Sequence, residues 1–122
     1  MKNILLVGFG GGLGSISRFL CQKYLYIISP HAFPIGTFAV NILGCFLIGI
    51  FFGLSEKGNL FSPEWRLLLT TGFCGGYTTF SSFAYENITL LKNGDFLYAG
   101  MYIVGSVVLG ITATFFGILL LK

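Results

Sequence analysis

Residues 70–83 read Thr70-Thr71-Gly72-Phe73-Cys74-Gly75-Gly76-Tyr77-Thr78-Thr79-Phe80-Ser81-Ser82-Phe83, and this stretch decides how the chain folds. It lies in the middle of an apolar segment from about residue 63 to about residue 91, long enough to cross a bilayer as a helix. Adjacent glycines followed by consecutive hydroxyl residues weaken a helix at that depth. In a membrane, a broken helix is tolerated only where the freed N–H and C=O groups are buried in protein or face a cavity, and freed carbonyls commonly bind a cation. The stretch therefore predicts a transmembrane helix broken near Gly75 to Thr78, with a simple kink as the alternative.

Three more apolar segments flank this one, at about residues 3–28, 33–54 and 96–121. Each is long enough for a hydrocarbon core that takes about 20 helical residues to cross. The chain is 55% hydrophobic and 9% charged. Because a soluble domain carries roughly 25% charged residues, a water-soluble fold is excluded. We predict an all-α membrane protein in which residues 1–122 form a single domain of four transmembrane helices.

The segment ends carry turn and cap signals. Ser29-Pro30-His31 closes the first segment, because proline disfavours helical geometry in the residue before it. Ser62-Pro63-Glu64 supplies an N-cap, a proline at the first helical position and an acid in the first turn. With four crossings, both termini face the same side.

The positive charges are too scattered to set one orientation firmly. Near the span ends, the terminal side carries Lys2, Lys57, Arg66 and Lys122, and the other side carries Lys23 and Lys92. So shallow a bias is compatible with insertion in both orientations, and two opposed copies recreate the inverted repeat of larger transporters. We therefore expect an antiparallel, dual-topology homodimer in the lipid bilayer. Singly scattered basic residues do not suggest nucleic acid as a partner.

The small residues favour packing over chemistry. Pairs of glycines four residues apart allow close helix approach; they are Gly8 and Gly12, Gly10 and Gly14, and Gly49 and Gly53. Cys21, Cys45 and Cys74 fall inside apolar runs without metal-ligand spacing, so we expect neither a disulfide nor a metal-thiolate site.

Polar and aromatic side chains recur at helical spacing on three of the four segments. The first set is Thr37 and Asn41; the second is Phe80 and Phe83 beside Thr78, Ser82 and Glu86; the third is Tyr102, Ser106 and Thr114. Each alone has an ordinary explanation, since hydroxyls often bond to their own helix and an asparagine often joins two helices. Together they indicate a lined pathway. Hydroxyl and amide donors with aromatic edges suit a small anion.

Arg18 lies well inside the first segment, where a guanidinium needs water, a partner or a carbonyl. It can snorkel towards the surface, but we expect it to line an aqueous vestibule and attract anions.

Three motifs, in order, resemble the Fluc (CrcB) family of small fluoride channels over the whole chain. They are Gly11-Gly12-Leu13-Gly14-Ser15-Ile16-Ser17-Arg18-Phe19, Pro34-Ile35-Gly36-Thr37-Phe38-Ala39-Val40-Asn41-Ile42-Leu43-Gly44, and residues 72–83 of the opening stretch.

The resemblance implies an antiparallel dimer in a bacterial inner membrane, with two fluoride pores and a role in fluoride resistance. It implies that Phe80 and Phe83 contact the ion by their edges and that Asn41 donates an amide near them. It implies a structural Na⁺ at the dimer centre, held by the backbone carbonyls of Gly75 and Thr78, and no organic cofactor. The residues matching the family's polar track are Ser81, Ser82, Glu86, Tyr102, Ser106 and Thr114, and Arg18 matches its vestibule arginine. Gly110 interrupts the track where a hydroxyl would have continued it.

Other functions fit less well. A proton-coupled exporter of the small multidrug resistance type should carry a glutamate in its first helix, where this chain has Arg18 and no acid. An enzyme would need an acid-base or nucleophile set, yet His31 lies in a turn and Glu86 is the single acid within a span. A non-conducting assembly subunit would leave the polar stripes without a purpose.

Overall fold

A computed structural model describes residues 1–28, 33–57 and 62–121. The predicted turn at Ser29-Pro30-His31 lies outside the described residues. So do Gly58 and Asn59 of the loop before the third crossing, and the terminal Lys122.

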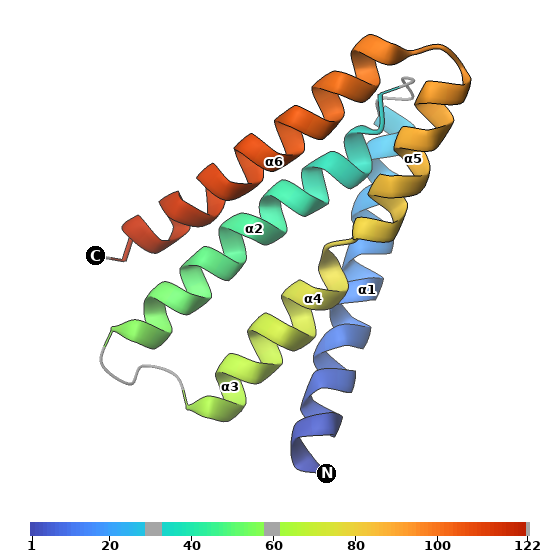
Figure 1. Cartoon of the computed structure of the whole chain (residues 1–122). Coiled ribbons are helices and arrows are strands. Elements are labelled where there is room, and N and C mark those ends of the chain that lie inside the picture. Colours follow the sequence, from blue (N-terminus) through green and yellow to red (C-terminus); the bar gives the residue numbers. More distant parts are fainter. Residues whose placement is uncertain (29–32, 58–61, 122) are drawn as a thin grey trace.

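Three long apolar helices cross from one end of the molecule to the other (Figure 1). They are α1 (Lys2–Ile28, 27 residues), α2 (Ile35–Glu56, 22 residues) and α6 (Phe96–Leu119, 24 residues), each long and apolar enough to span a membrane. The remaining crossing is built from four shorter pieces: α3 (Pro63–Leu67), the π-helical η1 (Leu68–Cys74), α4 (Gly75–Tyr77) and α5 (Phe80–Lys92). The molecule is a multi-pass membrane protein.

The predicted break in the third crossing is confirmed. Thr78 (φ −92°, ψ 161°) and Thr79 (φ −151°, ψ 123°) are extended, and the helix resumes at Phe80. The break therefore falls just after the glycine pair, where the consecutive hydroxyl residues begin.

The limits of the second helix differ from the prediction of about 33–54. Helix α2 begins at Ile35, because Phe33 precedes a proline and Pro34 is itself non-helical with ψ 72°. It continues through Ser55 to Glu56, so the polar loop begins later than its composition suggested. Helix α6 ends at Leu119, two residues earlier than predicted.

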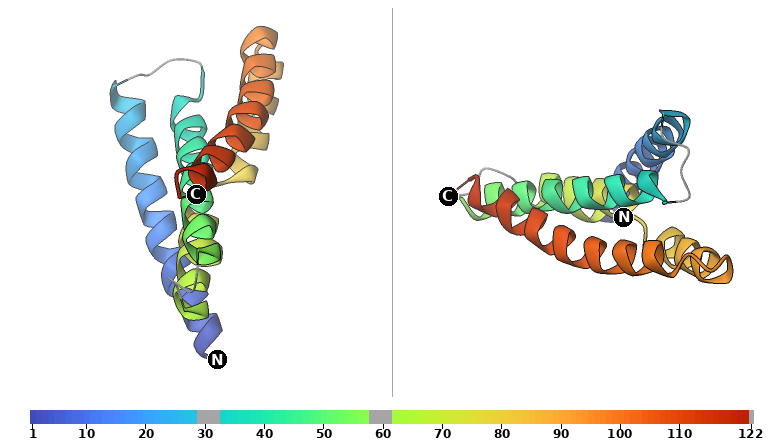
Figure 2. Two further views of the ribbon diagram at one scale, coloured as in Figure 1. Left: turned by 90° about the vertical axis from the view of Figure 1, so that its left-hand side faces the viewer. Right: turned by 90° about the horizontal axis from the view of Figure 1, so that it is seen from above.

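Helices α1 and α6 lie on opposite sides of α2 (Figure 2). Helix α1 packs along η1 and α4, where Gly14 lies against the backbone of Phe73 and Tyr77 and Gly76 lies against the backbone of Gly11. Helix α6 packs along α2, where Gly49 meets the backbone of Thr114. These contacts match the predicted packing role of the Gly10/Gly14 and Gly49/Gly53 pairs. The prediction for the other pair is wrong within the subunit, because nothing in the described structure lies within 4 Å of a Cβ added at Gly8 or Gly12.

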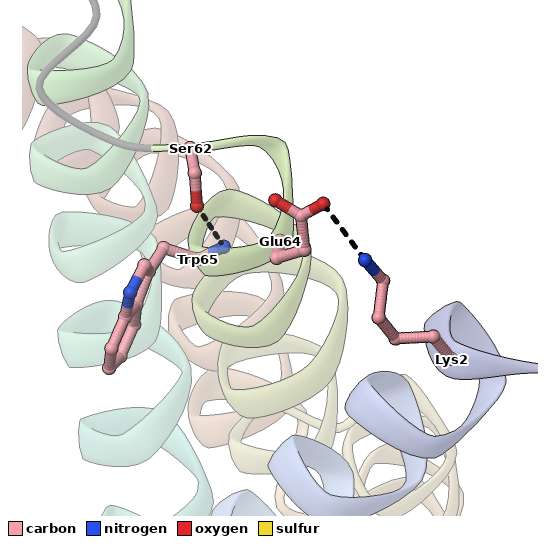
Figure 3. Close-up of polar contacts among 4 residues, drawn as sticks. All are labelled: Lys2, Ser62, Glu64 and Trp65. Atoms are coloured by element: carbon pink, nitrogen blue, oxygen red, sulfur yellow. Dashed lines mark hydrogen bonds and ion pairs between the residues drawn. The ribbon is translucent and has the colours of Figure 1, made fainter.

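The third crossing begins with the predicted cap. The Ser62 side chain accepts a hydrogen bond from Trp65 N at 3.2 Å, and Pro63 occupies the first turn (Figure 3). Beside it, Lys2 Nζ lies 3.3 Å from Glu64 Oε2, which ties the start of α1 to the start of α3. Both side chains are exposed, so this pair orients the chain end more than it stabilises the fold.

Replacing Gly14 by alanine is expected to lower the free energy of unfolding in detergent by about 1–3 kcal/mol, because the added Cβ would overpack a backbone contact. It would lie 2.9 Å from Tyr77 N, and a backbone atom cannot swing aside as a side chain can. Gly8→Ala, in the same helix and in open space, is the matched control. Equal thermal unfolding midpoints for the two variants would contradict the packing described for α1.

Candidate functional site

A cavity of about 280 Å³ lies where α2, α5 and α6 meet the break in the third crossing. Its lining, which we call the aromatic cavity, consists of Asn41, Cys45, Thr78, Thr79, Phe80, Phe83, Ser106 and Val107. Four residues predicted to form an anion pathway, Asn41, Phe80, Phe83 and Ser106, therefore face one space although they come from three helices.

The two phenylalanines of this cavity contact each other and differ in exposure. Their ring centroids are 5.6 Å apart with an interplanar angle of 40°. Phe83 is anchored on its other side by Tyr102, edge to face at 4.8 Å. Phe80 is 77% exposed in the single subunit. An aromatic ring this exposed in a membrane protein faces either lipid or a second subunit.

Asn41 binds the broken backbone at two points. Its Nδ2 donates to the Thr79 carbonyl at 3.1 Å, and its Oδ1 accepts from the Thr79 N–H at 2.8 Å. One amide N–H of Asn41 is left for another acceptor. The side chain thus joins α2 to the break while it lines the aromatic cavity.

The break frees two specific carbonyls. In a continuous helix the N–H of Thr79 would bond the carbonyl of Gly75, and the N–H of Ser82 would bond that of Thr78. Here Thr79 N–H donates to Asn41, and Ser82 N–H donates to the Thr79 hydroxyl at 3.2 Å. Within the part of the chain that the structure describes, no other donor takes their place. Both residues line a separate cavity of about 380 Å³ between α2 and the third crossing.

Arg18 lies beside the same break. Its Nε donates to the Gly76 carbonyl at 3.1 Å, so the guanidinium has found one of the partners that a charge at this depth requires. Arg18 does not line the larger cavity that opens between α1, α2 and α5.

A larger cavity, of about 740 Å³, opens between α1, α2 and α5. Among its lining residues are Gln22, Lys23, Thr37, Ser82 and Glu86. We call it the acidic cavity because the Glu86 carboxylate lies at its wall.

The Glu86 carboxylate is held by a short chain of hydrogen bonds. Thr37 donates to Glu86 Oε2 and Tyr102 donates to Oε1, both at 2.8 Å. Gln22 Nε2 in turn donates to the Thr37 hydroxyl at 2.9 Å. The hydroxyls of Thr37 and Tyr102, expected to face an anion, are therefore engaged by a carboxylate in this arrangement.

Comparison of the sequence with known proteins identifies the family of this chain. The family model described as CrcB-like protein, Camphor Resistance (CrcB), matches residues 5–118. The chain belongs to the CrcB-like family. It is 52% identical to a protein of Chlorobium phaeobacteroides (strain BS1) over 98% of this chain and 92% of the relative, and that protein is named fluoride-specific ion channel FluC. Proteins of the same name from Gloeothece citriformis (52% identical) and Flavobacterium psychrophilum (48% identical) align over 100% of this chain and 98% of their own length.

In this CrcB-like chain, some predicted site residues lie apart from the others. Thr78 does not share a helical face with Ser82 and Glu86, because the break removes it from α5; its hydroxyl donates instead to the Cys74 carbonyl at 3.0 Å. Ser81 is exposed, with its hydroxyl 3.2 Å from that of Thr79. The Thr114 hydroxyl lies 3.0 Å from the Cys45 carbonyl and 3.1 Å from the Gly110 carbonyl, so backbone satisfies it.

Two residues at the site were missed by sequence reasoning. Gln22 follows Arg18 by four residues, so the two share a face of α1, and this spacing was a usable signal. The sequence alone presents Thr79 as one of several hydroxyl residues that weaken the helix, yet Thr79 caps α5 and binds Asn41. The pairing of Thr79 with Asn41 joins residues 38 positions apart, which no local pattern reveals.

Proposed function

We propose that this chain is the subunit of a fluoride-selective channel that lets fluoride leave the cell passively, down its electrochemical gradient. The observation that carries the proposal is the aromatic cavity, which gathers Asn41, Phe80, Phe83 and Ser106 from three helices. The relatives named as fluoride-specific ion channels, about 50% identical over nearly the full chain, support the same ion. This geometry fits a pathway for an ion.

The chemistry of the lining explains selectivity. A small anion that leaves water must exchange its hydration for donors, and here these are the free amide N–H of Asn41, the Ser106 hydroxyl and the positive edges of two rings. The larger chloride ion gains less from donors spaced for a small one. Fluoride would be drawn from water near Lys23, pass through the acidic cavity and then meet the aromatic rings.

We propose that the working unit is an antiparallel homodimer with two such pathways. The exposure of Phe80 supports this, because a single subunit leaves one side of the aromatic cavity open. The weak charge bias supports insertion in both orientations. Reporter fusions at the C-terminus should be detected on both sides of the bacterial inner membrane; detection on one side alone would contradict the antiparallel arrangement.

We further propose that a structural Na⁺ is held at the dimer centre by the carbonyls of Gly75 and Thr78. The two residues fit, because both carbonyls have lost their helical donors and both residues line one cavity. When bound, Na⁺ would neutralise these dipoles and fix the break in its extended form.

Sodium should then stabilise the folded dimer. If the ion binds only the folded state, a concentration a hundred times its Kd adds about 2.7 kcal/mol to the free energy of unfolding. The measurement is the unfolding midpoint of the purified dimer in NaCl and in N-methylglucamine chloride of equal ionic strength. Equal midpoints in both salts would contradict a bound sodium.

The function itself is tested by efflux from liposomes that contain the purified protein. Vesicles loaded with potassium fluoride and potassium chloride are diluted into impermeant anion, a potassium ionophore is added, and ion-selective electrodes follow both anions. We expect rapid fluoride loss while chloride stays inside. Equal rates for the two anions, or no loss of either, would contradict the proposed function.

A further inference from the structure

The polar face of α6 has a gap at its third position. Tyr102, Ser106 and Thr114 follow each other at steps of four and eight residues, and the missing step is Gly110, which is buried and has no side chain to offer. An ion that moves along this face meets no donor from α6 at that level.

The space beside Gly110 is occupied by a polar group from another helix. A Cβ built on Gly110 would lie 3.4 Å from the sulfur of Cys45 and 3.9 Å from Cδ1 of Ile42, both on α2. The thiol is therefore in van der Waals contact with the place where a side chain at Gly110 would begin. Cys45 is also one of the residues that line the aromatic cavity together with Ser106, and it lines the cavity of Gly75 and Thr78 as well.

The hydroxyl groups of α6 on either side of Gly110 differ in whether they already have a hydrogen-bond partner. The Ser106 hydroxyl oxygen is buried without a hydrogen-bond partner in the described structure, which is costly unless something in the cavity pairs with it. The Thr114 hydroxyl is held by the carbonyls of Cys45 and Gly110 and is not free to donate elsewhere. Cys45 is a half-buried free cysteine, and the group through which Thr114 binds it is its backbone carbonyl, not its sulfur. The thiol is thus a side-chain donor beside Gly110.

We propose that Cys45 lines the fluoride pathway and supplies from α2 the donor that Gly110 fails to supply from α6. The inference rests on the proposed function of this cavity as a fluoride pathway. A neutral thiol is a weak hydrogen-bond donor, and its small volume leaves room for an ion beside Gly110. A cysteine that merely filled space would contribute volume and no donor.

A donor swap between the two helices separates these roles. Cys45→Val keeps a similar volume and removes the donor, while Cys45→Ser keeps a donor and strengthens it. The double variant C45A/G110S moves the donor from α2 to α6, into space vacated by the sulfur. Fluoride and chloride efflux from liposomes is measured for each, with size-exclusion elution and the unfolding midpoint as controls for folding.

We expect Cys45→Val to slow fluoride efflux about twofold to fivefold, because a weak donor contributes at the lower end of what a hydrogen bond is worth. Cys45→Ser should conduct at least as fast as the native chain. C45A/G110S should return at least to the native rate, because a hydroxyl donor is restored at the same level. If C45A/G110S does not fold, the contrast between the valine and serine variants decides the question.

The outcomes that overturn the inference differ from those that overturn the function. A native chain that releases no fluoride removes the proposed function. A native chain that conducts, with Cys45→Val equally fast, shows that the thiol is no part of the pathway. A folded C45A/G110S variant that stays as slow as Cys45→Val shows that Cys45 acts by packing.

Discussion

Fluoride efflux through the Phe80→Ile variant is expected to fall by up to about tenfold, because one ring edge is worth up to about 1.5 kcal/mol and isoleucine offers no polarised edge in its place. Phe83→Ile should show a loss of the same order. The two rings lie 5.6 Å apart on one cavity, and isoleucine fills similar volume without a polarised edge. Rates are measured in liposomes with a fluoride electrode.

The matched control for these variants is Phe115→Ile. Phe115 is also a largely exposed ring, 58% against 77% for Phe80, but it lies on α6 away from the cavity lining. It should conduct at the native rate. A Phe80→Ile variant that folds and conducts as fast as this control would contradict the role given to the aromatic pair.

Replacing Asn41 by leucine is expected to have the largest effect on both stability and transport. It leaves the half-buried Thr79 N–H without its acceptor and removes one donor from the Thr79 carbonyl, which as the N-cap carbonyl of α5 also accepts a helical N–H. One unsatisfied buried donor costs about 1–3 kcal/mol, so the free energy of unfolding should fall by about that amount. The break should rearrange and fluoride efflux should be lost.

Asn87→Leu is the matched amide variant. Asn87 is buried in α5, and its Nδ2 donates to the Phe83 carbonyl within the same helix, while its Oδ1 has no partner in the described structure. Removing this side chain leaves every backbone group of the break with the hydrogen-bond partner it has in the native chain. If Asn41→Leu proved no less stable than Asn87→Leu by thermal unfolding, the two-point bond to Thr79 would not be what holds the break.

Much of the architecture was predictable because bilayer thickness imposes length on apolar segments. Helices α1, α2 and α6 could be predicted from length and hydropathy, and the break from two glycines followed by hydroxyl residues. The errors at α2 came from local chemistry: Pro34 delays the start of the helix, and a polar ending such as Ser55-Glu56 does not stop it.

The site was harder to predict because helical stripes assume a continuous helix. Once the chain is extended at Thr78 and Thr79, Thr78 no longer shares a face with Ser82, and its hydroxyl turns back to Cys74. The other contacts at the site join residues that are distant in sequence. The Glu86 carboxylate accepts hydrogen bonds from the hydroxyls of Thr37 and Tyr102, and the sulfur of Cys45 lies beside Gly110.

The central claim is that fluoride itself occupies the aromatic cavity beside Phe80 and Phe83. Solid-state NMR on the protein in liposomes with sodium fluoride, with ¹³C in the phenylalanine rings, measures the dipolar coupling between ring carbons and the ¹⁹F of the ion. We predict ring signals that lose intensity through fluoride contact, with this loss absent from the double variant F80I/F83I and retained in Phe115→Ile. Contact that persists unchanged in F80I/F83I, or no contact at all in a protein that conducts fluoride, would contradict the account.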